Sequence, residues 1–289
     1  MKPLTLVALA FLAAGQIFPG QAVADSSKAQ TKEGGIIGTG IVGIVTDLGS
    51  IWVNGQHIRY DPGTEVEGPF GTRPASALRP GDCVAVLAEP EGDGWRALSI
   101  REMRALVGPV ETVGAGHLTV MGIAVDTKGA KMTATPKTGD WVAVSGLWKE
   151  DGVMASKVDP APGDMAMVSG SFSDAGGIPR VGAVTLDGIR PHHARPGDVM
   201  TAMGHPGTGT IDAETVELGI FAQEPGTVIA QGYLSRPVEG GFYTLLGSGL
   251  VAFAQDPEMT VPDAPLLYCG KGDRLGTPVI DGDASVCME

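Results

Sequence analysis

The chain has 289 residues, of which 44 are glycine and 21 are proline, and 33 acidic residues against 20 lysines and arginines give a formal net charge of −13. This acidic balance disfavours a nucleic-acid partner, because phosphate backbones are bound by lysine and arginine side chains that displace counterions. Cationic, neutral or protein partners are compatible with it.

The first 24 residues have the pattern of a secretory signal peptide. Lys2 gives a positive start, residues 4–14 are apolar, and small residues at 22–24 form a cleavage pattern. We expect cleavage near Ala24, a formal charge that goes from −13 to −14 with the loss of Lys2, and a periplasmic or secreted protein. Residues 25–36 are predicted to be a flexible leader. No later stretch reaches the roughly 20 apolar residues of a membrane-spanning helix, so no membrane insertion is predicted.

A short motif recurs along the chain at a fixed interval of 58 residues. It consists of a basic residue, proline or threonine, glycine and aspartate, and it occurs at residues 79–82, 137–140 and 195–198. An apolar run and then a turn rich in glycine and acidic residues follow the motif. A repeat of this length indicates tandem supersecondary modules.

Four modules are expected, because four segments open with a glycine and an extended run, at residues 43–45, 108–110, 170–172 and 232–234. We place the modules at residues 37–104, 105–162, 163–222 and 223–289. The fourth is the most degraded, since it has no Gly-Asp pair near residue 255 and residues 262–270 replace the motif. Terminal repeats often depart in this way.

The residue pattern predicts an all-β protein. Short runs rich in valine, isoleucine and threonine alternate with glycine, proline and aspartate, and no long helical period occurs after the signal peptide. About five strands a copy suit small five-stranded, OB-like barrels of the oligonucleotide/oligosaccharide-binding type, with a small β-sandwich as the alternative. We expect a hairpin after each opening, with a second strand that ends in an apolar-x-Gly signature, at residues 53–55, 120–122, 186–188 and 245–247. Asn54-Gly55 predicts a type I′ turn, and residues 70–77 are expected to be a loop insertion of the first copy.

The first copy resembles a known family of exported bacterial domains of unknown function. The resemblance lies in the segments GTGIVGIVT, GSIWVNG and LRPGDCV, at residues 38–46, 49–55 and 78–84. It covers residues 36–103, and the later copies are less similar. The resemblance implies a small β-barrel that is often repeated within one chain. It implies no activity and no catalytic residues, because the family has none assigned.

Three cysteines in an exported chain indicate a disulfide first. Cys269 and Cys287 are the natural pair, since both lie near the C-terminal end and are 18 residues apart. Cys83 is then left over. We interpret it as a buried thiol, with an intermolecular partner as the alternative.

Two patterns that suggest chemistry have simpler explanations. Gly38, Gly40 and Gly43 match the dinucleotide-binding fingerprint, but no strand precedes them and no helix follows, so no cofactor is predicted. The repeated aspartates could be imagined as a ring of carboxylates. Proline and glycine before them instead favour a type II turn with the aspartate at its end, at Asp82, Asp140 and Asp198.

The third copy holds the candidate metal ligands. His192, His193 and His205 accompany Met200 and Met203, and histidine with thioether ligands suits copper in an exported protein. Their spacing matches no ligand template, and methionines often fill cores. Near the C-terminus, Asp281-Gly282-Asp283 suggests calcium but lacks the later acidic ligands of a calcium loop.

No string of residues typical of nucleophilic catalysis occurs, although triads are assembled in space and an enzyme is not excluded on this ground. The tryptophans have two interpretations, because exposed indole rings can stack on sugars and buried ones fill cores or module junctions. The four are Trp52, Trp95, Trp141 and Trp148, and Trp141 is expected to cover a junction.

These patterns together predict a non-catalytic, exported binding or scaffolding protein of the cell envelope, with an envelope protein or a glycan as its partner. A periplasmic metal-binding accessory protein of the copper type is one alternative. A hydrolase is the other, and it would require a cleft that holds a nucleophile within hydrogen-bond reach of a base.

Overall fold

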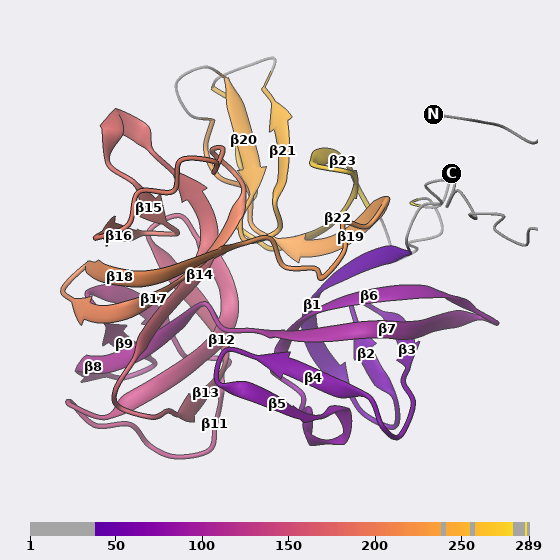
Figure 1. Cartoon of the computed structure of the whole chain (residues 1–289), viewed down its shortest axis with the longest axis horizontal. Helices are drawn as coiled ribbons and strands as arrows, with labels where there is room; N and C mark the ends of the chain where they lie inside the picture. Colours follow the sequence, from indigo (N-terminus) through magenta and orange to yellow (C-terminus); the bar gives the residue numbers. More distant parts are fainter. Residues whose placement is uncertain (1–37, 238–240, 255–257, 280–286, 288–289) are drawn as a thin grey trace, which may run out of the picture. The chain divides into compact units, whose positions relative to one another are not determined.

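The computed structural model describes residues 38–237, 241–254, 258–279 and 287 (Figure 1). The predicted signal peptide and leader, and the predicted calcium motif at residues 281–283, lie outside this part of the chain. The described part is all-β, with two short 3-10 turns and no α-helix. No helix in it is long and apolar enough to cross a membrane.

The first module closes into a five-stranded barrel. Its strands pair in the order first, second, third, fifth, fourth and back to the first, and only the third and fifth are parallel. This is the strand order of the OB-type barrel. The strands are β1 (Thr39–Asp47), β2 (Ile51–Val53), β3 (Gln56–Arg59), β6 (Cys83–Glu91) and β7 (Gly94–Met103).

The second and third modules repeat this closed pairing order. The second barrel comprises β8 (Leu106–Gly114), β9 (His117–Val120), β10 (Ile123–Asp126), β12 (Trp141–Lys149) and β13 (Gly152–Pro160), with the short β11 (Lys131–Met132) beside β13. The third comprises β14 (Ala166–Ser173), β15 (Arg180–Val181), β16 (Val184–Asp187), β17 (Val199–Gly207) and β18 (Thr210–Leu218).

The fourth module has the same strand order, but a single bridge between Leu234 and Leu245 closes it. Its strands are β19 (Thr227–Gly232), β20 (Phe242–Leu245), β21 (Leu250–Phe253), β22 (Leu266–Lys271) and β23 (Arg274–Pro278). The prediction of tandem small barrels is therefore confirmed, and the β-sandwich alternative is wrong because the sheets close on themselves. All these strands lie within the four predicted ranges; that each range is a separate domain stays a prediction.

Strand pairing joins the barrels in two pairs. β1 runs parallel to β19, so the first and fourth barrels share one sheet, and β8 pairs with β14, which joins the second barrel to the third. The second and third barrels also share one cluster of buried apolar side chains. The barrels are thus packed and hydrogen-bonded to one another.

The recurring Gly-Asp motif forms the same turn in three barrels. Gly81, Gly139 and Gly197 have φ of +103°, +90° and +96°, and the next residue donates its N–H to the carbonyl three positions back. This is the predicted type II turn. Each aspartate carboxylate accepts the N–H of the first turn residue at 2.7–2.8 Å. The glycine and aspartate backbones also bond the first strand of their barrel, so the turn closes the barrel.

Two local predictions need correction. The hairpin turn of the third copy lies at Gly182-Ala183, not at residues 186–188. Only glycine fits at residue 182, because the Trp148 ring packs against its backbone and would lie 2.6 Å from an added Cβ. Residues 71–77 are not a loop. They form β5 (Gly71–Pro74) and a 3-10 turn, and β5 is held in place because it pairs with β4 (Glu65–Gly68), which itself pairs with β7.

The type I′ turn predicted at Asn54-Gly55 is confirmed by φ of 56° and 75°.

We expect Gly139→Ala to lower the free energy of unfolding by about 1–2 kcal/mol, because an L-residue at positive φ is strained. Nothing lies within 4 Å of the added Cβ, so the effect is conformational alone. Gly129→Ala is the matched control in the same barrel, since Gly129 has equal space and no positive φ. Urea denaturation followed by circular dichroism measures both, and an equal loss in the two variants would contradict the turn argument.

Candidate functional site

An aromatic pair lies on the outer face of the first barrel. Trp52 on β2 and His57 on β3 are cross-strand partners, and their rings stack with centroids 4.7 Å apart and an angle of 19° between the planes. The Ser50 hydroxyl and Nε2 of His57 are hydrogen-bonded to each other, which fixes the orientation of the imidazole. Trp52 is 38% exposed.

Strand alternation places this pair outside the barrel. Ile51, Val53 and Ile58 are fully buried in the core of the first barrel, so the residues between them on β2 and β3 point to solvent. In OB-type barrels the face of the second and third strands is the surface that binds ligands. The exposed indole therefore lies where this fold offers a binding surface.

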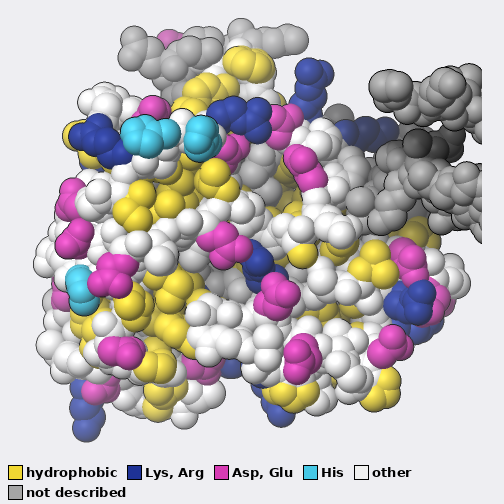
Figure 2. Space-filling model, viewed as in Figure 1, with side chains coloured by type: hydrophobic (Ala, Val, Ile, Leu, Met, Phe, Trp, Pro, Cys, Tyr) yellow, Lys and Arg dark blue, Asp and Glu magenta, His cyan; other side chains and the backbone are white. Residues whose placement is uncertain are grey.

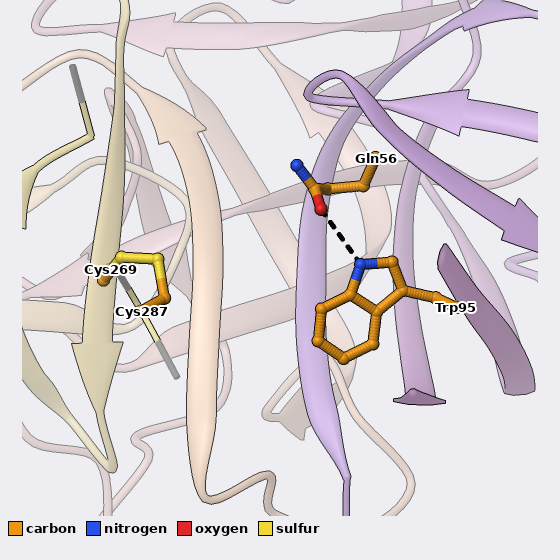
Figure 3. Close-up of a disulfide and its surroundings, with 4 residues drawn as sticks. All are labelled: Gln56, Trp95, Cys269 and Cys287. Carbon is orange, nitrogen blue, oxygen red and sulfur yellow. Dashed lines mark hydrogen bonds between the residues drawn. A yellow bond between two sulfur atoms is a disulfide. The ribbon is translucent and has the colours of Figure 1, made fainter. Parts of the chain in front are cut away.

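The other tryptophans are packing residues. Trp95 is buried and donates its indole N–H to the Gln56 side chain at 2.9 Å (Figure 3). Trp148 is buried and donates to the Ser169 carbonyl of the third barrel at 2.6 Å. Trp141 is partly buried against the shared core of the second and third barrels and lies beside Gly163, in the link between them. Among the four, Trp52 alone presents an exposed ring.

A closed ring of six alternating charges joins the first barrel to the second. Each charge contacts two of opposite sign, and five of the six ion pairs measure 2.8–3.2 Å. The sixth pair is Arg104 with Glu102. Side-chain exposure around the ring is 0% to 28%, so the charges face one another rather than solvent. In order, the ring comprises Arg73, Asp82, Lys157, Asp159, Arg104 and Glu102.

The fully buried Asp82 is the most constrained member of this ion ring. Burial alone would raise the pKa of its carboxyl, but hydrogen bonds from Lys157, from the Arg79 backbone and from Arg73 outweigh burial and lower the pKa below 3.8. The charged form is therefore favoured in the folded state. The ring links the first barrel to the second, and each of its charges is paired within the ring. We therefore interpret it as a structural contact between the two barrels rather than a ligand site.

We expect Asp82→Asn to lower the free energy of unfolding by about 3–5 kcal/mol near neutral pH, since Arg73 and Lys157 each lose one of their two carboxylate partners and the largely buried ring is left with an excess positive charge. Asp140→Asn, at the equivalent exposed turn, should cost about 1 kcal/mol or less. Because the folded-state pKa of Asp82 is lowered, its contribution is present above pH 3.8 and is lost as pH falls through the folded-state pKa. Urea titrations should show the gap between wild type and Asp82→Asn narrowing below pH 3.8, and a pH-independent gap would count against the ion ring.

Comparison with known proteins finds one family. Residues 39–101 and 107–159 match the sequence profile of a family described as a domain of unknown function (DUF5666). Two segments of the chain are therefore similar to this domain. The match confirms the resemblance of the first copy to an uncharacterised domain family and extends it to the second barrel. No curated protein and no solved structure is significantly similar to the chain.

The two segments that match this family differ at the aromatic pair. The second copy has Thr119 paired with Ala124 where the first has Trp52 with His57. In the third barrel the corresponding pair is Arg180 with Thr185. In the fourth barrel the corresponding pair is Thr244 with Val251, but two positions further from the turn the second and third strands carry an aromatic pair, Phe242 with Phe253, and Phe253 is 80% exposed. The aromatic pairs thus occur on the two barrels that share the β1–β19 sheet.

The predicted metal ligands are placed at the surface. His192, His193 and His205 are all exposed, and Nε2 of His205 lies 3.0 Å from a Glu214 carboxylate oxygen. Within the described ranges, no three histidine, cysteine, aspartate or glutamate side chains are grouped so that they could hold a metal ion. Met200 is instead fully buried in the shared core of the second and third barrels, which is the ordinary role of methionine.

The cysteines behave as their spacing predicts. Cys269 on β22 and Cys287 form a disulfide with Cα atoms 5.5 Å apart (Figure 3). Cys83 is a free thiol at the start of β6 and is 3% exposed. Burial raises the pKa of this thiol to about 12. Since the thiolate is the reactive species, the folded protein holds Cys83 in an unreactive form.

Ellman's reagent should therefore label no thiol in the native protein at pH 8, and one thiol per chain in 6 M guanidinium. The test uses the non-reduced protein, and Cys83→Ala should show no label in either state. Fast labelling of the native protein would contradict the burial of Cys83.

Proposed function

We propose that this is a non-catalytic, exported binding protein that recognises a glycan through the β2–β3 face of its first barrel. The observation that carries the proposal is the exposed Trp52 ring stacked on His57 at the binding face of an OB-type barrel. The C–H groups of a pyranose ring pack against the electron-rich face of an indole. Rigid strands on both sides hold the Trp52 ring in place for such a contact.

The surroundings of Trp52 favour an uncharged or amino-bearing sugar. Ser50 and His57 offer polar atoms beside the ring, and Asp47, opposite Trp52 on β1, is exposed. Acidic side chains are spread over the face shown in Figure 2 and interleave with basic and hydrophobic ones. With a formal net charge of −13, the protein repels polyanionic glycans at a distance.

One contact supports a hydrolase as a second candidate. The Ser50 hydroxyl and the His57 imidazole are within hydrogen-bond reach, as a nucleophile and its base would be. However, Trp52 stacks on the His57 ring and covers one side of it, which leaves less room for a substrate at the Ser50 hydroxyl. The binding function accounts for the indole ring, the imidazole and the hydroxyl together.

Isothermal titration of residues 25–289 with cello-oligosaccharides and chito-oligosaccharides, N-acetylated and deacetylated, tests the proposal. Trp52→Ala should weaken binding at least about 10-fold, because it removes the stacking surface. Phe70→Ala is the matched control, since Phe70 is another exposed aromatic residue of the first barrel and lies in the turn between β4 and β5 rather than on β2 or β3. Absence of binding by the wild type, or equal binding by Trp52→Ala, would overturn the proposal.

Ser50→Ala separates the two candidates. It should retain most glycan binding, because the hydroxyl supports His57 but does not form the stacking surface. Release of reducing ends or of p-nitrophenol from chromogenic glycosides and esters by the wild type, lost in Ser50→Ala, would favour the hydrolase instead.

A further inference from the structure

A cavity of about 410 Å³ lies between the second and fourth barrels. The turn between β12 and β13 forms one side, the chain after β19 forms another, and residues 259–263 before β22 form the third. A cavity of this volume suits a small organic ligand. It is separate from the β2–β3 face, so it is not explained by the proposed glycan site.

Two ion pairs stand at the rim of this cavity. The Lys149 ammonium pairs with Asp263, and the Glu150 carboxylate accepts hydrogen bonds from the backbone N–H of Arg236 at 3.2 Å and pairs with its Nε at 3.3 Å. Side-chain exposures of 36% to 89% show that all four charges reach solvent. Exposed pairs of this kind contribute little to stability, so exchanging a partner for a ligand group costs little.

The floor between the ion pairs is apolar and aromatic. The Tyr233 ring is 7% exposed, and the Lys149 ammonium lies 5.7 Å from its centroid. Leu234 is buried, and Met259 and Val261 pack against the same apolar cluster. The cavity therefore combines paired positive and negative side chains at its rim with an apolar inner surface.

The backbone of Glu150 is strained at this rim. Its φ is +34°, and the matching position of the first barrel, in the turn between β6 and β7, is Gly92 at +62°. A glutamate costs conformational energy where glycine would not. The two-residue turn between β12 and β13 requires a positive φ here, and it places the Glu150 carboxylate at the rim of the cavity.

We propose that this cavity binds a zwitterionic α-amino compound with an apolar side chain, either a free amino acid or a short peptide with free termini. The ligand carboxylate binds Lys149 and Arg236, and the ligand ammonium binds Asp263 and Glu150. The apolar side chain rests on Met259 and Val261. In both ion pairs the ligand carboxylate takes the place of the acidic partner, and the ligand ammonium takes the place of the basic partner. No charged side chain is therefore left without a counter-charge.

Isothermal titration of residues 25–289 with leucine and with Leu-Leu tests this site and separates the two ligand sources. Binding of one or both is expected, and blocking either end of the bound ligand, by N-acetylation or by C-terminal amidation, should weaken it at least about 10-fold. Absence of binding up to millimolar concentrations, or equal binding of the blocked ligands, would overturn the proposal.

Glu150→Gly is the informative variant, because glycine adopts positive φ without strain and the fold should be kept. We expect weaker ligand binding with a melting temperature that is not lowered. Lys128→Met is the matched control, since Lys128 forms an exposed ion pair with Asp126 elsewhere on the second barrel. Trp52→Ala should bind the zwitterion as the wild type does, which keeps this test independent of the glycan proposal. Full binding by Glu150→Gly would count against the assigned carboxylate.

Discussion

The Asp82 carboxylate takes part both in the closure of the first barrel and in the contact between the first barrel and the second. One oxygen accepts the Arg79 N–H and so completes the turn that closes the first barrel, and the other accepts a hydrogen bond from Lys157 of the second barrel. The same aspartate in the next two copies serves the turn without such a buried partner. A residue type fixed by local backbone geometry has therefore gained a long-range partner in one copy only, and that addition joins two barrels.

The four barrels keep the same strand order while their outer surfaces differ. Glycine and aspartate at the closing turn are set by backbone geometry, which every copy but the last shares. Outward positions on the second and third strands are free of this constraint. They carry aromatic pairs in the first and fourth barrels, and polar or small residues in the two between. The array is thus one scaffold that presents chemically different faces.

The sequence predicted those features that depend on local backbone geometry. The type II turns and the Asn54-Gly55 turn follow from residues close in the chain, and the repeat shows the type II turns more than once. The barrel type followed from about five short strands in each copy. The ion ring was not predictable, because Lys157 comes from a different copy than Arg73 and Asp82, and the three residues share no spacing. The third hairpin was misplaced for a related reason. Its glycine is required by the Trp148 ring of the preceding barrel, and a pattern within one copy does not contain that information. The exposure of Trp52, and hence its choice among four tryptophans, also needed the three-dimensional structure.

The parallel pairing of β1 with β19 has a consequence for how such a protein can grow. Residues 39–42 of β1 bond β6 on one side and β19 on the other, so the backbone of the opening strand is occupied at both edges. Open repeat arrays gain or lose units at their ends with little penalty. Here the fourth barrel is already hydrogen-bonded to the first, so deletion of an inner barrel would have to break or re-register that sheet. The β1–β19 pairing therefore makes the two inner barrels a required spacer between the two that share a sheet.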